Sequence, residues 1–198
     1  MKKGWMLVGI FSLLFFANPL HAQDKFEVFG GYSYIWGSVN LLQGGNCVTL
    51  PCPPPESFNG HINLNGWEAS GLYKFTDAIG VVADFGGNYG SVPSSGGGSS
   101  IHRETYMFGP QFSYPARVSP FVHALFGGAH QSVGAGSLTG ISFASSSNAF
   151  AMAFGAGIDI KVSPLVSFRP IQLDYLTTRF NSAWQSQPRI SAGVVFHF

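Results

Sequence analysis

Charged side chains are scarce in this chain. Asp, Glu, Lys and Arg make up 10% of the 198 residues, against roughly 25% in ordinary soluble domains. A soluble surface normally carries more charge than this. Without Lys2 and Lys3, the ten basic residues fall to eight against nine acidic ones, and the formal net charge changes from +1 to −1. That balance gives no electrostatic footprint for nucleic acid, so we exclude nucleic-acid binding.

Long apolar runs are also missing. Nothing after Ala22 reaches the roughly 20 residues that a membrane-spanning helix requires, which excludes a bundle of such helices. One shorter apolar stretch follows Lys2 and Lys3 and ends near Ala22. A basic start, an apolar centre and a small residue at the end are typical of a secretory signal peptide. We therefore predict a cleaved signal peptide over residues 1–22 and one domain over 23–198; the alternative is a retained anchor helix.

Cysteine is limited to Cys47 and Cys52, which share one segment rich in Pro and Gly. Export through an oxidising compartment favours their pairing, so we predict a disulfide that staples a loop. A structural zinc site needs four ligands, and only His61 lies near this pair in the sequence. We expect no metal site and no cofactor.

The residues that are abundant form a period-two pattern. Hydrophobic residues make up 45% of the chain, with 19 Phe and 26 Gly. In the first run Phe26, Tyr32 and Trp36 share one face, and Glu27 and Ser33 share the other. Each run is near the 9 to 11 residues, roughly, of a tilted membrane strand. The eight runs lie at 25–37, 67–75, 79–89, 103–114, 121–131, 150–161, 168–178 and 189–198.

Three places disturb the alternation. Gly109-Pro110 lies inside the fourth run, and because Pro lacks a ladder donor we predict a bulge or local bend there rather than the end of a strand. Arg169-Pro170 coincides with a slip of register in the seventh run, which predicts a second bulge. The fifth run, 121–131, does not reveal which of its faces is apolar.

The connections between runs alternate between long and short. The tight ones are 76–78, 115–119 and 163–164, and the longer ones are 38–63, 90–101, 132–147 and 181–188. Membrane barrels have short periplasmic turns and longer external loops. The pattern therefore predicts that both ends of the chain lie on the side of the short turns.

The scarcity of charge decides which face points outward. The less apolar face holds mainly Gly, Ser, Ala and Thr, which fit the narrow interior of an eight-stranded barrel. We therefore predict an all-β, eight-stranded, antiparallel, up-and-down transmembrane β-barrel with its aromatic face toward lipid. Aromatic residues near the ends of the runs would form girdles at the headgroups, although aromatics favour strands of every kind. They are Tyr34, Trp36, Trp67, Tyr89, Tyr106, Tyr114 and Phe198.

The opening strand 26–36, the segment Leu173-Asp174-Tyr175 and the closing segment 194–198 with its final Phe occur in a recognisable order. In this the chain resembles the OmpA/OmpX-like family of small outer-membrane β-barrel proteins. The resemblance covers nearly all of the domain. It implies location in a bacterial outer membrane, contact with outer-membrane lipid and lipopolysaccharide, and a closing strand, with Phe196 and Phe198, that the outer-membrane assembly machinery reads.

Charged residues of both signs are expected on the inward face. Charges in a narrow lumen are costly unless paired, so we predict a cross-strand polar network that plugs the barrel, with a structural or surface-interaction role for the protein. A narrow channel for ions or small solutes is the alternative. The predicted network comprises Glu27, Glu68, Lys74, Asp84, Arg103, Asp159, Lys161, Arg169, Asp174 and Arg189.

One short motif raises the question of catalysis. His130-Gln131-Ser132 resembles the His-x-Ser element of outer-membrane lipid A deacylases, in which a His acts as general base for a Ser hydroxyl. The Asn that follows Ser in that family is Val133 here. We find no other catalytic set and expect no enzymatic activity. The loop that contains Cys47 and Cys52 would either bind an extracellular partner or shield the barrel mouth.

Overall fold

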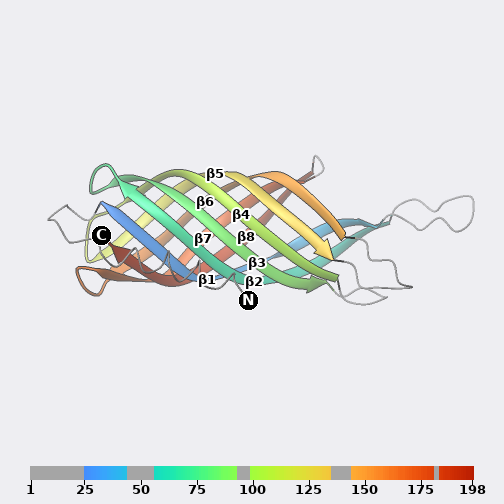
Figure 1. Ribbon diagram of the computed structural model, residues 1–198, viewed down its shortest axis with the longest axis horizontal. Helices are drawn as coiled ribbons and strands as arrows, with labels where there is room; N and C mark the ends of the chain where they lie inside the picture. Colours follow the sequence, from blue (N-terminus) through green and yellow to red (C-terminus); the bar gives the residue numbers. More distant parts are fainter. Residues whose placement is uncertain (1–24, 44–55, 93–98, 135–143, 181–182) are drawn as a thin grey trace, which may run out of the picture.

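The computed structural model describes residues 25–43, 56–92, 99–134, 144–180 and 183–198 (Figure 1). Each strand pairs antiparallel with the next, and β1 also pairs with β8, so the sheet closes into a barrel. The predicted eight-stranded up-and-down barrel is confirmed. No helix in the described part of the chain is long and apolar enough to cross a membrane. The strands are β1 (Phe26–Gln43), β2 (Glu56–Lys74), β3 (Ile79–Val92), β4 (Ser99–Ser113), β5 (Val118–Gly134), β6 (Ala144–Lys161), β7 (Val166–Phe180) and β8 (Ala183–His197).

The strands are longer than the sequence pattern predicts. They run for 14 to 19 residues, and most of the predicted loop 38–63 is strand, because β1 continues to Gln43 and pairs there with Glu56 of β2. Ladder hydrogen bonds join backbone groups and do not require alternating side chains. The pairing therefore continues past the point where the apolar alternation fades.

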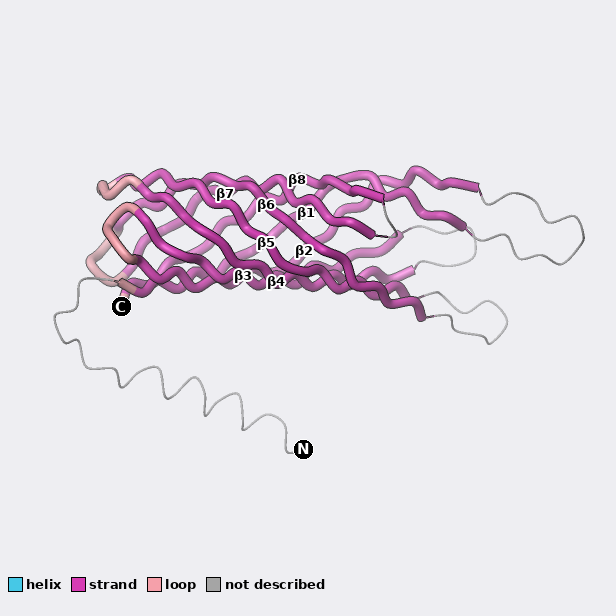
Figure 2. The backbone as a smooth tube through the Cα atoms, turned by 90° about the horizontal axis from the view of Figure 1, so that it is seen from above, coloured by secondary structure: helices cyan, strands magenta, loops and turns pink. Residues whose placement is uncertain are grey.

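The two ends of the barrel differ, as Figure 2 shows. At one end three tight turns join β2 to β3, β4 to β5 and β6 to β7; we call it the short-turn end. The amide of Phe75 donates to the carbonyl of Ile79 over 2.9 Å in the first of these turns. The chain ends meet here too, because the amide of Phe198 donates to the carbonyl of Phe26 over 2.8 Å. The opposite end, where β1 ends and β2 begins, is the long-loop end.

The inward and outward faces follow the predicted alternation. Phe85 and Phe108 on the outward face are 53% and 66% exposed, whereas Glu68 and Arg103 on the inward face are 1% and 0% exposed. In the ambiguous fifth run, Phe121 points inward. Of the predicted girdle residues, Tyr34 is half-buried and the other six are exposed.

The two predicted bulges have different outcomes. The register between β7 and β8 shifts between Arg169 and Gln172, so the bulge there is confirmed. The predicted bulge at Gly109-Pro110 is wrong, because β4 keeps one register with β3 through Val81 opposite Pro110. Pro110 points outward. Gly109 lets β5 come close, since a Cβ there would meet the Ala124 carbonyl oxygen.

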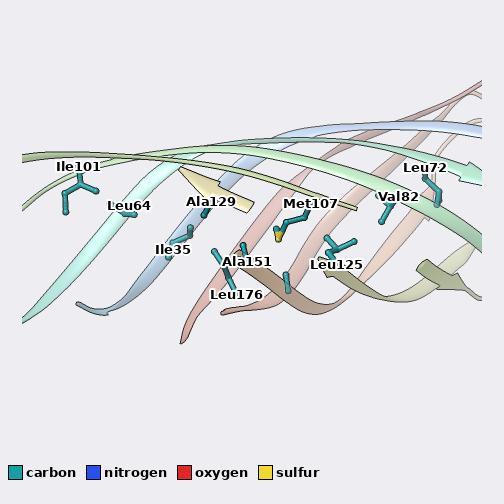
Figure 3. Close-up of a cluster of buried hydrophobic side chains, with 11 residues drawn as sticks. Ile35, Leu64, Leu72, Val82, Ile101, Met107, Leu125, Ala129, Ala151 and Leu176 are labelled. Carbon is teal, nitrogen blue, oxygen red and sulfur yellow. The ribbon is translucent and has the colours of Figure 1, made fainter. Parts of the chain in front are cut away.

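Apolar side chains fill part of the lumen (Figure 3). An eight-stranded barrel leaves room for side chains alone, and packed aliphatic groups from β1 to β7 take up part of this space. The expectation of a polar interior was therefore incomplete. The cluster consists of Ile35, Leu64, Leu72, Val82, Ile101, Met107, Leu125, Ala129, Ala151, Ala153 and Leu176.

Candidate functional site

The remaining lumen holds a column of polar side chains. Of the ten predicted network residues, Lys74 is half-buried. Lys161, in contrast to the prediction, is exposed, because β6 ends there at the short-turn end. The other eight are buried, namely Glu27, Glu68, Asp84, Arg103, Asp159, Arg169, Asp174 and Arg189.

Arg189 lies at the centre of this column, among three carboxylates. Its Nη1 is 3.1 Å from Asp84 Oδ1, its Nη2 is 2.7 Å from Asp174 Oδ2, and its Nε is 3.4 Å from Glu68 Oε2. The four residues come from β2, β3, β7 and β8. One guanidinium therefore joins strands that face each other across the lumen, and its single positive charge lies among three carboxyl groups.

Neutral and ionisable side chains complete the hydrogen bonding of these carboxylates. The amide of Gln172 donates to Glu68 Oε1 over 2.7 Å and to Asp174 Oδ2 over 2.9 Å, and the Ser191 hydroxyl donates to Glu68 Oε2 over 2.5 Å. His123 Nε2 lies 2.7 Å from Asp174 Oδ1. These bonds hold Glu68 and Asp174 on two sides, whereas Asp84 is held by Arg189.

Gly155 makes room for one of these contacts. A Cβ at this position would collide with Asp174 Oδ1 and would lie 2.5 Å from His123 Nε2. The bare backbone of β6 therefore allows the His123–Asp174 pair to sit against the barrel wall, and a larger residue would displace it.

Arg169 closes the column below the central cluster. Its guanidinium makes two parallel bonds to Asp159, Nε to Oδ1 at 2.6 Å and Nη2 to Oδ2 at 2.9 Å, and Nη1 donates to Gln172 Oε1 over 2.7 Å. The guanidinium carbon lies 4.4 Å from the ring centroid of Phe29 and 4.2 Å from that of Phe121. All three nitrogens of the guanidinium are thus bonded, and two aromatic rings lie against it.

A cavity of about 570 Å³ opens at the short-turn end. On its floor Glu27 pairs with Lys74 and accepts from His197 Nδ1 at 3.0 Å. His197 Nε2 is 2.7 Å from the Ser167 hydroxyl. Both signs of charge line the cavity walls, so it is a polar vestibule with an internally paired floor.

Arg103 forms the upper part of the column, toward the long-loop end. Its Nε and Nη2 donate to Gln131 Oε1 over 3.1 Å and 2.6 Å, and its Nη1 donates to Gln187. The amide of Asn88 donates to the Ser33 hydroxyl over 3.4 Å. The column therefore extends from the vestibule to the upper barrel, and it shares the inward faces of most strands with the aliphatic cluster. No group of three or more His, Cys, Asp or Glu among the described residues is arranged to hold a metal ion.

His130 and Ser132 lie on the outward face of β5, away from the lumen column. His130 Nδ1 is 2.7 Å from Asn148 Oδ1 on β6. Glu104 of β4 is the cross-strand neighbour of His130, but the described residues contain no hydrogen bond between His130 and Ser132 or between His130 and a carboxylate.

Some contributors to the column were not among the predicted network residues. Gln187 lies two residues before Arg189 on the same inward face. The period-two alternation of this strand could therefore have identified Gln187 as a lumen residue. Phe121 and His123 lie in the run whose faces the sequence left ambiguous. Cys47 and Cys52, the predicted disulfide, and residues 1–22, the predicted signal peptide, lie outside the described residues.

Comparison with known proteins places the fold. No protein-family model matches the chain, and no curated protein matches it. Solved structures do match: Neisserial surface protein A at TM-score 0.63 and 16% identity, covering 88% of this chain and 97% of that one. Ail of Yersinia pestis, in complex with the heparin analogue sucrose octasulfate, matches at 0.57 and 18% identity over 87% and 97%. OprG of Pseudomonas aeruginosa matches at 0.51 and 11% identity over 87% and 95%. The chain therefore has the fold of the small outer-membrane β-barrels.

Proposed function

We propose that this chain, with the fold of the small eight-stranded outer-membrane barrels, is an integral protein of a bacterial outer membrane. Its lumen is plugged by side chains, it is not an enzyme, and its role is structural or one of surface interaction. Outer-membrane lipid and lipopolysaccharide surround it.

The observation that carries this proposal is the inversion of the two faces. Twenty-nine large apolar side chains of the described residues are exposed, and they include Phe85, Phe126 and Phe154 in the middle of their strands. Soluble monomers rarely expose apolar patches of more than a few hundred Å². Most of the charged network lies inside instead. A hydrocarbon surrounding accounts for both facts, because apolar groups face lipid without cost and charges avoid it.

The side chains that fill the lumen support a barrel that does not conduct ions. Arg169 is clamped between two rings and Asp159, Arg189 ties together opposite strands, and the aliphatic cluster fills the adjoining space. An ion would have to displace several charge-assisted hydrogen bonds to pass. We expect purified protein in planar bilayers to show no discrete conductance steps. Steps whose ion preference changes on Glu68→Gln or Arg103→Gln would favour the channel instead.

Two parts of the barrel are assigned to partners. The closing strand β8, with Phe196 and Phe198 exposed on its outward face, is the segment that the outer-membrane assembly machinery would read. The long-loop end is the place for an extracellular partner. The Ail structure is a complex with the heparin analogue sucrose octasulfate, which supports ligand binding by a barrel of this fold.

The geometry around His130 supports a non-catalytic reading. A general base must reach the hydroxyl that it deprotonates, whereas His130 is bonded to Asn148 and has no bond to Ser132. We expect purified protein to release no acyl chains from lipid A. Release that is lost in Ser132→Ala would establish a barrel deacylase and contradict the proposal.

The decisive experiment is fractionation of cells that express the full chain. We expect the protein in the outer membrane, with migration on a gel that changes on boiling, and an N-terminus at Gln23 after signal cleavage. Protein recovered free in the periplasm, or a mobility that boiling does not change, would contradict the membrane assignment. An intact N-terminus in the membrane fraction would contradict only the predicted cleavage.

A further inference from the structure

Four buried polar atoms in the described part of the lumen have no hydrogen-bonding partner within the protein. They are Asn88 Oδ1, Thr105 Oγ1, Gln187 Nε2 and Arg189 Nη2. Nη2 of Arg189 lies 2.7 Å from Asp174 Oδ2, but this ion pair lacks the geometry of a hydrogen bond. None of the four residues is more than 3% exposed. Folded proteins leave very few buried polar groups unsatisfied, because each one costs free energy.

Register places two of these residues beside one another on β3 and β4. Asn88 pairs with Arg103, and Gly86 pairs with Thr105. Asn88 and Gly86 share the inward face of β3, as Arg103 and Thr105 share that of β4, because residues two apart point the same way. Asn88 and Thr105 therefore border one stretch of the lumen wall.

The other two residues reach the same stretch from β8. Arg103 Nη1 donates to the side chain of Gln187 across the lumen. A Cβ on Gly86 would lie 2.8 Å from Thr105 Oγ1 and 3.5 Å from Arg189 Nη1, so the bare α-carbon of Gly86 faces both. The four side chains thus line one stretch of the lumen between Arg103 and Arg189, which we call the arginine chamber.

The chemistry of the chamber selects its ligand. Gln187 Nε2 and Arg189 Nη2 can only donate, Asn88 Oδ1 can only accept, and the Thr105 hydroxyl can do either. A cation would meet two guanidinium groups, and an anion would meet Asp84 and the carboxylates beyond it. A neutral molecule that both donates and accepts satisfies all four atoms, and water is small enough to reach them.

We propose that the arginine chamber binds a cluster of ordered water molecules. These waters accept from Gln187 and Arg189 and donate to Asn88, and Thr105 completes the cluster. They would join the carboxylate cluster around Arg189 to the Arg103–Gln131 layer, so bound water would take part in the polar column. This site is independent of where the barrel resides and of any partner at its loops.

Thr105→Val tests the proposal, because valine has the shape of threonine without its hydroxyl. If water bonds Thr105, the variant leaves that water short of a partner, and the midpoint temperature of heat unfolding falls by a few degrees. If the chamber is dry, the variant removes an unsatisfied hydroxyl, and an unchanged or raised midpoint would overturn the proposal. Thr177→Val is the matched control. Its hydroxyl contacts Ser186 at 3.2 Å outside the lumen, and its midpoint should change little.

A second measurement does not depend on a variant. In the folded wild-type barrel in detergent micelles, nuclear magnetic resonance can detect transfer of magnetisation from water to the Thr105 methyl group. We expect transfer to Thr105 and none to the methyl groups of Leu125 in the aliphatic cluster. Absence of transfer to Thr105 would overturn the proposal whatever the heat unfolding shows.

Discussion

Asp159 accepts two parallel hydrogen bonds from Arg169, at 2.6 Å and 2.9 Å. The rings of Phe29 and Phe121 pack against the Arg169 guanidinium and hold it in the orientation that both bonds to Asp159 require. This pairing depends on a planar fork that lysine does not have.

We therefore expect Arg169→Lys to lower the free energy of unfolding by about 2 kcal/mol, through the lost stacking and the lost second bond. Urea titration of the lipid-inserted barrel, followed by the gel mobility of the folded form, measures this change. Arg117→Lys, at an exposed position in the turn between β4 and β5, should have almost no effect. An equal loss in both variants would mean that the clamp contributes nothing specific.

Arg189 supplies the positive charge that three buried acidic side chains share. Arg189→Met leaves Glu68, Asp84 and Asp174 together, each at most 3% exposed. Removal of one partner from a buried charge network costs about 3–5 kcal/mol, and we expect that loss in urea titration. Adding Glu68→Gln should restore part of the stability because it removes one of the unpaired charges. A double variant less stable than the single one would contradict this account.

Gly155 offers a test of close packing with a matched partner. Gly155→Ala places a methyl group against Asp174 and His123, and overpacking of this kind typically costs about 1–3 kcal/mol. Gly30→Ala adds the same methyl group on the outward face, where nothing lies within 4 Å. We expect a clear loss in heat unfolding for the first variant and almost none for the second. Equal effects would point to the glycine backbone rather than to the pair.

The outward face can be probed on one strand. Phe154 and Ser146 both point outward on β6, the first in the apolar band and the second near the long-loop end. In lipid, Phe154→Arg should cost about 2–4 kcal/mol and Ser146→Arg at most about 1 kcal/mol. Equilibrium refolding into vesicles measures both. Similar costs at the two positions would contradict a membrane-facing band at Phe154.

Phe198 separates assembly from stability. Its backbone is bonded to Phe26 in both directions, at 2.8 Å and 3.3 Å, and its exposed ring lies 6.4 Å from that of Phe26. Phe198→Ser keeps the backbone bonds, so refolding in vitro should be almost unchanged. The amount of folded barrel in the outer membrane of cells should fall several-fold. Normal amounts in cells would contradict the proposed role of this residue in assembly.

Strand order, closure and most face assignments could be predicted because one physical rule repeats along the chain. Phe85 and Asp84, for example, are neighbours in sequence, but Phe85 faces outward and Asp84 faces the lumen, since alternation on a strand has period two. The inward face of the fifth run could not be predicted in this way, because Phe121 and Val122 are both apolar. Phe121 is inward because its ring covers Arg169, a contact between β5 and β7 that no local pattern reveals.

The contacts within the polar column were harder to predict than the residues that form it. Alternation identifies Asp84, Asp174 and Arg189 as inward, but their contacts depend on how far each strand is staggered around the closed barrel. The bulge expected at Gly109-Pro110 failed for a related reason. A proline on the outward face interrupts the ladder without adding a residue, and sequence alone cannot separate the two cases.

The meeting of β1 and β8 has a consequence for the order of events in folding. The first strand in the chain has no partner on one side until the last strand is available, so one edge of β1 stays unpaired until β8 joins it. A chain interrupted before β8 would keep two unpaired edges, each a template for pairing with another copy. The barrel can therefore close, with no unpaired edge, only after all eight strands are present.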